Sequence, residues 1–338
     1  MRKLLTIAVP IIVVLAGVLA WTQFKGSSTP TSTTTTTTTT PPPTYPTAPL
    51  SGLKDPTGLS VKRPALTIKI ENTPEALPQW GVDQADVVYE EIVNGGITRL
   101  AAIFNSHAPV KVGPVRSVRP TDTQIVWPLG GIFAYSGGAA YAVASISTAP
   151  VKLIDESRAG AAMFRDPSRY APHNLFAVAP SLFAFTGASP VPPPVLFTYR
   201  SGTKPPGGPS VSKIVVPFPS IYGVTWTWNV ATQSWDRTLF GQPDVTGTGV
   251  RESPKNVVVM FVNYVNGIGT EASYANLQGS GPVTIFTDGK KLVGTWSRGS
   301  SKGDVVTYQS ATGKPIALTP GQTWVELLNT GAALSVTK

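Results

Sequence analysis

The sequence predicts an α+β protein, in which an N-terminal mixed α/β domain is followed by a β-rich antiparallel C-terminal domain. Short apolar stretches alternate with polar residues and with tight-turn residues along much of the chain. Proline and glycine occur 33 and 32 times, which disfavours long helices and coiled coils. Charged residues make up only 13% of the 338 residues, about half of the usual ~25%. The hydrophobic share of 41% is large enough to build real cores.

The first 26 residues read as a targeting element. Arg2 and Lys3 precede an apolar run, Leu4–Trp21, whose 18 residues are at the lower limit for spanning a hydrocarbon core. We expect a single membrane anchor with a cytoplasmic N-terminus. A cleaved signal peptide is the alternative, because Val18–Ala20 offers small residues at a suitable spacing. The expected location is therefore the cell membrane with the domains on the extracytoplasmic side, or secretion after cleavage.

A low-complexity linker follows at residues 27–50. It contains eight consecutive threonines at 33–40 and three prolines at 41–43. Such a segment has no apolar periodicity and cannot bury a core. In a polyproline-like state it would reach about 70 Å, at ~3.1 Å per residue. We expect an extended stalk or a flexible tether.

Composition excludes several kinds of chemistry. The absence of cysteine excludes disulfides, thiolate metal sites, a cysteine nucleophile and a lipidated N-terminal cysteine. Two histidines leave little room for a histidine metal site, and the sequence has no Gly-rich phosphate loop, so we expect no cofactor and no metal. The net charge of +9 is scattered rather than gathered in basic runs, and we expect no nucleic-acid partner.

The N-terminal domain is expected at residues 59–200. Residues 86–93 and 97–104 flank Asn94-Gly95-Gly96, and this pattern predicts a β-hairpin. Further strands are expected at 131–136 and 151–155. Helices are expected after Pro120, capped by Thr121 or Asp122, and also at 139–147 and 180–185.

The C-terminal domain is expected at residues 210–335, after proline-rich stretches at 189–194 and 202–209. Residues 224–228 alternate as in a half-buried strand, and residues 256–262 form a buried-strand run. Asp288-Gly289 predicts a tight turn between strands at 283–286 and 292–296. Gly313 and Gly321 punctuate two more strands, the last of which includes residues 324–328.

A series of motifs extends over about residues 50–335. It comprises Ile68–Ala76, Tyr89–Glu91, Gly95–Arg99, Gly113–Pro120, Ala171–Leu175, Asp288–Trp296 and Pro320–Leu327. Together these motifs resemble the YerB-like lipoprotein family of bacteria, a family of unknown function with N- and C-terminal halves. The resemblance implies an envelope location and two halves, but no reaction. Lipoprotein members carry an N-terminal cysteine, which this chain lacks, so an anchor or secretion must replace lipidation here.

Two closely spaced arginines indicate a candidate anion-binding site. Arg116 and Arg119 lie three residues apart between two prolines, in a segment expected to be an extended loop. Guanidinium groups bind carboxylate or phosphate in a bidentate manner, so the two side chains are a candidate clamp for phosphate, uronate or a peptide carboxylate. In the alternative, they are internal braces that pair with Glu71, Glu90 or Glu91.

Acid/base chemistry is the second possibility. On a strand, Glu90 and Glu91 point to opposite faces, so they cannot act together, and Glu90 needs a cationic or hydrogen-bonding partner among apolar neighbours. His173 lies in a polar loop and is a candidate general base, or simply a loop-bracing side chain. The candidate catalytic residues are Glu90, Glu91 and His173. The candidate ligand-binding residues are Glu71, Asn72, Arg99, Arg116, Arg119, Arg165, Arg169 and Asn174.

These residues leave two functions open. The favoured one is an extracytoplasmic binding module, whose Arg/Glu cleft in the N-terminal domain holds an anionic cell-envelope polymer, a peptide or an envelope protein. The alternative is an extracytoplasmic hydrolase or transferase that acts on an envelope glycan or phosphodiester, with Glu90/Glu91 or His173 as acid/base. A purely structural spacer is supported only by the stalk. The sequence does not decide whether the protein is an enzyme.

Overall fold

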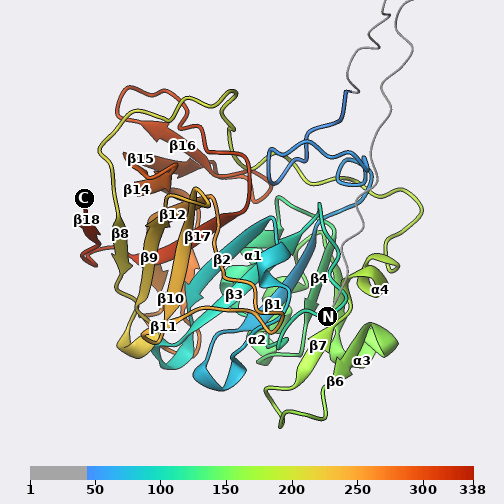
Figure 1. Cartoon of the computed structure of the whole chain (residues 1–338). Coiled ribbons are helices and arrows are strands. Elements are labelled where there is room, and N and C mark those ends of the chain that lie inside the picture. The colour runs from blue at the N-terminus through green and yellow to red at the C-terminus, as the bar shows by residue number, and fades with distance from the viewer. Residues whose placement is uncertain (1–43) are drawn as a thin grey trace, which may run out of the picture. The chain divides into compact units, whose positions relative to one another are not determined.

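A mixed sheet of 11 strands runs through the centre of the computed structural model, which describes residues 44–338 (Figure 1). Ten strands follow one path, and β13 (Tyr274–Asn276) pairs with β12 beside it. In order across the sheet they are β16 (Thr307–Ser310), β15 (Lys290–Arg298), β14 (Gly279–Thr287), β12 (Asn256–Val265), β17 (Thr323–Asn329), β2 (Val87–Ile92), β3 (Thr98–Phe104), β1 (Leu66–Glu71), β4 (Ile132–Tyr135) and β5 (Lys152–Asp155).

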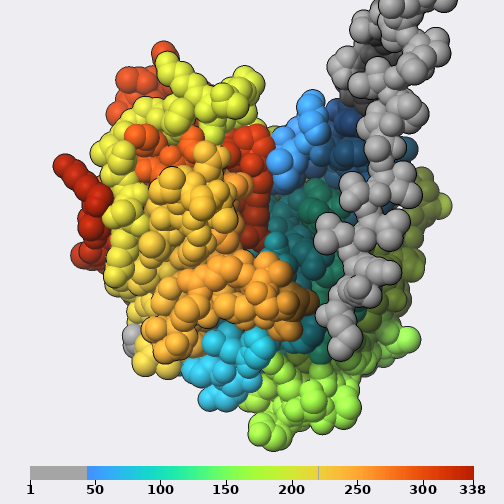
Figure 2. Space-filling view, in the orientation of Figure 1, coloured from blue at the N-terminus to red at the C-terminus, as the bar shows by residue number. Residues whose placement is uncertain are grey.

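Strand β17 joins the two halves of the chain within this sheet. It pairs in parallel with β12 on one side and with β2 on the other. Figure 2 shows the C-terminal half, coloured yellow to red, packed directly against the blue-to-green N-terminal half. The sheet is therefore continuous across the expected boundary near residues 200–210. The boundaries of the two domains themselves stay predictions.

A second sheet of five strands covers part of one face of the large sheet. Its order is β11 (Gln242–Pro243), β10 (Ser234–Leu239), β9 (Val224–Asn229), β8 (Lys213–Val216) and β18 (Ser335–Thr337). Trp226 and Trp235 of this sheet pack with Val257 and Trp324 of the large one in a single core. On the N-terminal half, the same core includes the hairpin of β6 (Met163–Arg165) and β7 (Leu175–Ala177) and helix α4 (Ala179–Phe183).

Helices α1 (Pro120–Val126) and α2 (Ala140–Ile146) pack on the opposite face, where they form a second core with Phe133 and Val258. Since both faces of the sheet are covered, every residue of β2 is buried. The remaining helical elements are short: α3 (Glu156–Ala159) and the 3-10 turns Pro74–Ala76, Val82–Gln84, Asn94–Gly96, Gly160–Ala162 and Ser220–Tyr222.

The predicted fold class is correct in part. The expected hairpins at 86–104 and 283–296 are present as β2–β3 and β14–β15, and both pairs are antiparallel. The described chain is richer in strands than an α+β class implies, and the C-terminal half is not purely antiparallel, because β17 pairs in parallel with β12.

The predicted cap of α1 is wrong: the helix begins at Pro120 after the N-cap Arg119, and Asp122 accepts the backbone N–H of Arg119 at 2.7 Å. The predicted anchor and most of the linker lie outside the described residues. Within residues 44–338, no helix has the length and apolar character needed to span a bilayer.

Candidate functional site

Strands β1, β4 and β2 of the large sheet all have their carboxyl ends at the same border of the sheet, which forms its carboxyl edge. Strand β3 begins at the same edge, and Arg99 lies in register between Glu71 of β1 and Glu91 of β2. Side chains in register on neighbouring strands share a face, so this row alternates acid, base and acid. The carboxyl ends of parallel strands are a common place for ligands in open sheets.

Segment 113–119 completes this edge. The Arg116 N–H donates to the Lys69 carbonyl at 2.9 Å, and the loop after β4 donates its Ser136 N–H to the Arg116 carbonyl at 3.0 Å. The segment is an extended loop, as predicted, and ends where α1 begins. Backbone bonds on both sides therefore fix the positions from which Arg116 and Arg119 project.

Below this edge lies a buried ion triad. The Lys69 ammonium bonds the Glu91 carboxylate and lies 2.7 Å from Asp122, and all three side chains are at most 1% exposed. Burial raises the pKa of Asp122 to about 6, although Lys69 opposes this shift. The triad ties α1 to β1 and β2, so it positions the start of α1 and with it Arg119.

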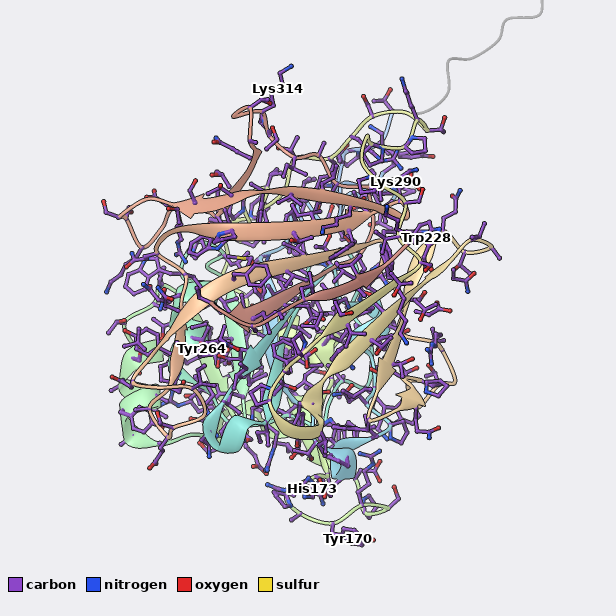
Figure 3. The ribbon with its side chains drawn as sticks, turned by 90° about the vertical axis from the view of Figure 1, so that its left-hand side faces the viewer. Tyr170, His173, Trp228, Tyr264, Lys290 and Lys314 are labelled. Carbon is purple, nitrogen blue, oxygen red and sulfur yellow. The ribbon has the colours of Figure 1, made fainter. Side chains whose placement is uncertain are left out.

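Glu71 is a buried carboxylate that pairs with two partly exposed side chains at this edge. Its two oxygens lie 3.1 Å from Arg116 Nε and 2.9 Å from His173 Nδ1, while its own side chain is only 1% exposed. The Arg116 and His173 side chains are 20% and 22% exposed. Figure 3 places His173 with Tyr170 at one end of the molecule, on the β6–β7 loop. The loop thus reaches back to the end of β1.

Arg99, Arg116 and Arg119 form what we call the arginine cluster. Arg99 is 6% exposed and Arg119 is half-buried, yet neither has a carboxylate within 4 Å among the described residues. Arg99 donates to the Ser117 carbonyl at 3.0 Å, and Arg119 donates to the Asn94 side chain at 2.8 Å. The Nε atoms of both are buried without a hydrogen-bond partner.

The electrostatics of this cluster favour an added anion. Burial, and then the charges of Arg119 and Arg116, lower the pKa of Arg99 to about 9. Burial also lowers the pKa of Arg119. Lys69 and the three arginines are four cations facing the three carboxylates of Glu71, Glu91 and Asp122. One positive charge remains uncompensated in a mostly buried setting, where an unpaired charge is costly.

Glu90 lies on the other face of β2, as its alternation with Glu91 predicts. It is fully buried and accepts from Arg237 at 2.7 Å and from Asn72 at 3.0 Å. Arg237, from β10, also pairs with Asp244. Arg237 and Asn72 are thus the cationic and hydrogen-bonding partners of Glu90, for which the sequence predicted one or the other. Asn72 is likewise buried within this network, where its side-chain amide donates to Glu90 and to Thr98.

Burial favours a bracing role for both candidate catalytic glutamates. Glu90 pairs with Arg237 and Glu91 with Lys69, and both glutamates are at most 1% exposed. A dissolved substrate cannot reach either carboxylate in this structure. The structure thus favours the bracing alternative for these two glutamates, and their assignment as acid/base residues stays a prediction.

Three further candidates belong to the β6–β7 loop rather than to the cluster. Arg165 forms a bidentate pair with Glu156 and donates to Asn174 at 2.8 Å. Arg169 donates to the backbone carbonyls of Ala76 and Pro78. These bonds hold the loop against the segment after β1, so the loop presents His173 to Glu71.

Sequence reasoning missed Lys69, Asp122 and Asn94. Lys69 alternates with apolar residues in Leu66–Glu71, and a lysine within such a buried strand pattern is a sign of an internal ion pair. The three cavities for which the structure gives volumes are lined by other residues than the arginine cluster. The candidate site is therefore a partly exposed cationic edge.

Comparisons with known proteins give a family and a fold. The model described as "Protein of unknown function (DUF3048) N-terminal domain" matches residues 50–189, and the corresponding C-terminal domain matches residues 214–325. The protein named "Putative lipoprotein YerB" from Bacillus subtilis (strain 168) is 41% identical over 90 residues, which span 27% of this chain and 27% of that relative.

A solved structure is similar over a longer stretch. The crystal structure of YerB protein from Bacillus subtilis matches with a TM-score of 0.75 and 22% identity, and covers 87% of this chain and 100% of that one. At this identity the similarity shows the fold.

Proposed function

This chain belongs to the DUF3048 family, and from that premise we propose that it is an extracytoplasmic module that binds an anionic cell-envelope ligand through the arginine cluster. The resemblance to YerB-like proteins, predicted from scattered motifs, is confirmed. The relative from Bacillus subtilis is named a lipoprotein, which supports an envelope location for this chain. The chain itself has no cysteine to lipidate.

The observation that carries the proposal is the uncompensated charge at the sheet edge. Arg99 is 6% exposed, lacks a carboxylate partner among the described residues, and has two arginines beside it. Nearby like charges destabilise one another unless an anion joins them. A bound carboxylate or phosphate would accept from Arg116 and Arg119 and lie within the field of Arg99. Guanidinium groups suit both anions because they donate two parallel bonds.

A polymeric ligand fits this edge better than a small metabolite. Arg116 and Arg119 are only partly buried, and the cluster is open at the surface. A cationic surface binds a polymer with many anionic groups more tightly than it binds a single anion. When one anionic group dissociates, the next group on the same polymer is already close, so the local concentration of anions stays high. The module would therefore hold envelope polymers or acidic protein segments that carry many charges.

The test measures the binding of two anionic hexamers, a glycerol-phosphate oligomer and a glutamate peptide. The protein used is the exported part of the chain, residues 27–338, which follows the expected targeting element. Arg119→Gln is the main variant, because Arg119 pairs with no carboxylate within residues 44–338 whose charge would be left unbalanced. A charge-assisted hydrogen bond contributes ~1.5–3 kcal/mol, so we expect Arg119→Gln to weaken binding by about tenfold or more. Calorimetric titration at 50 and 300 mM salt gives the affinities, which should fall with salt.

Arg158→Gln is the matched control. Arg158 carries the same charge, is 64% exposed on α3, and lies only loosely beside Asp155 at 3.9 Å. The control should bind like the wild type, whereas Arg116→Gln combined with Arg119→Gln should abolish binding. Undiminished affinity of that double variant for both hexamers would refute the proposal. Thermal melting of each variant separates lost binding from lost folding.

A further inference from the structure

A separate pocket lies between helices α1 and α2 and the end of β15, and it is independent of the arginine cluster's proposed role. Its volume is about 310 Å³, at the lower end of the ~300–1,000 Å³ typical of small-ligand sites. We call it the α1–β15 pocket. Its main polar and aromatic lining comes from four parts of the chain: Gln124, Trp127, Tyr274, Gln278, Arg298 and Lys302.

Arg298 is a buried cation in the wall of this pocket. It is 5% exposed, donates to the Gln124 carbonyl at 2.7 Å and to the Lys302 carbonyl at 2.5 Å, and has no carboxylate within 4 Å among the described residues. Its Nε atom is buried without a partner. Burial lowers the pKa of Arg298, so an anion in the pocket would restore an interaction that the wall lacks.

Lys302 adds a second cation at the mouth. Its side chain is exposed, and its ammonium lies 4.4 Å from the centre of the Trp127 ring. A lysine stem is flexible, and a cation–π contact at an exposed site contributes only ~0.5–1 kcal/mol. Lys302 can therefore turn toward an anionic ligand and uncover the indole face.

The remaining lining is suited to hydroxyl groups. Tyr274 supplies a phenol with no hydrogen-bond partner among the described residues, and the Gln278 side chain donates to the Ser300 carbonyl at 3.3 Å, which leaves its carbonyl oxygen free to accept. An aromatic face beside amide and hydroxyl groups fits the apolar face and the hydroxyl rim of a sugar ring.

We propose that the α1–β15 pocket binds a single sugar residue that carries a carboxylate or a phosphate group. The acidic group lies between Arg298 and Lys302, the ring packs on Trp127, and its hydroxyls meet Tyr274 and Gln278. The volume suits one residue rather than an extended segment. The class of ligand thus differs from the polymer proposed for the arginine cluster, although one envelope glycan can carry both.

The experiment titrates the wild-type exported part with four probes, monitored by calorimetry and by saturation-transfer NMR. D-Glucuronate and glucose 6-phosphate represent the two acidic sugars, D-glucose the neutral ring, and inorganic phosphate the free anion. We expect at least one acidic sugar to bind saturably and at least about tenfold more tightly than glucose or phosphate. Whichever of the two binds tighter identifies the acidic group.

Lys302→Gln tests the assignment without disturbing the wall, because Arg298 donates to the backbone carbonyl of Lys302 rather than to its side chain. We expect about tenfold weaker binding, and Tyr274→Phe should weaken it about threefold. Lys314→Gln is the matched control, since Lys314 is an exposed lysine that is not among the residues lining the pocket.

Four results would overturn the proposal. They are binding of no acidic sugar, equal affinity for glucose or for inorganic phosphate, unchanged affinity of Lys302→Gln, and loss of binding in Arg119→Gln but not in Lys302→Gln. The last result would assign the sugar to the arginine cluster. If a hexamer binds at the arginine cluster but no acidic sugar binds in the α1–β15 pocket, the proposed function is supported and the proposal for the pocket is wrong.

Discussion

A buried arginine and its carboxylate partners link the two sheets. Arg237 is fully buried between Glu90 of β2 and Asp244, and its guanidinium also lies 4.5 Å from the centre of the Trp324 ring. Glu326 accepts from Trp226 at 2.8 Å on the same side, and burial, reinforced by Glu90, raises its pKa well above the usual range. One arginine thus offsets several carboxylates between the layers.

Arg237→Met should therefore be strongly destabilising. The change leaves Glu90 and Asp244 buried without a cation, and breaking a buried ion pair from one side costs about 3–5 kcal/mol. We expect that loss in the free energy of unfolding, measured by urea denaturation at neutral pH. Neutralising both acids as well, with Glu90→Gln and Asp244→Asn, should recover at least half of it.

The exposed Arg158→Gln serves as the reference and should change stability by less than about 0.5 kcal/mol. A loss below 1 kcal/mol in Arg237→Met would show that the carboxylates become protonated at little cost. The sequence predicted that Glu90 needs a cationic or hydrogen-bonding partner, but Arg237 lies 147 positions away. Pairing at such a distance depends on the packing of two sheets, which no local pattern encodes.

At the scale of an element, the turn into β4 positions the arginine cluster. Gly131 has φ +79° and lies against Ala65, whose carbonyl accepts the Ile132 N–H at 3.0 Å. Beyond the far end of β4, the Gly137 carbonyl accepts the Val118 N–H at 2.9 Å. A shift of β4 would therefore move the loop that carries Arg116 and Arg119.

Gly131→Ala and Gly130→Ala form a matched pair that tests this turn. Both glycines have positive φ, so each alanine pays ~1–2 kcal/mol for a left-handed backbone. Only at Gly131 would the new Cβ lie 2.2 Å from the Ala65 carbonyl oxygen, whereas at Gly130 the nearest atom is 3.8 Å away. We expect Gly131→Ala to cost at least ~2 kcal/mol more in urea denaturation. Equal losses would mean that the turn absorbs the added methyl group.

Local patterns predicted elements better than their pairings. The Asn94-Gly95-Gly96 and Asp288-Gly289 turns identified two hairpins, because turn chemistry fixes the register of the strands beside it. Strands β6, β8 and β18 were among those missed, since each has three or four residues and too little alternation to stand out, but the six-residue strands β1 and β10 were missed as well. Of the candidate site, the Arg116–Arg119 segment was found, but its neighbours Lys69 and Asp122 were not.

At the scale of the whole molecule, the central position of β17 makes each half depend on the other. The strand comes from the C-terminal end of the chain and fills the place between β12 and β2. Tyr264 reinforces this junction, because its hydroxyl accepts the Ile92 N–H at 2.9 Å and donates to the Leu327 carbonyl at 2.8 Å (Figure 3). Without β17, β2 would present an open edge of unpaired backbone groups.

Separate production of residues 45–205 and 206–338 tests this dependence. The first fragment loses the strand beside β2 and the Arg237 partner of Glu90, and exposed, unpaired strand edges favour aggregation. We expect neither fragment alone to unfold cooperatively, whereas residues 45–338 should give one transition by circular dichroism and by tryptophan fluorescence. Mixing the two fragments under refolding conditions should restore that transition, because the missing strand is supplied in trans. Two independent transitions in the intact protein, matched by those of the isolated fragments, would instead establish two separately folding domains and make the shared sheet a docking contact between them.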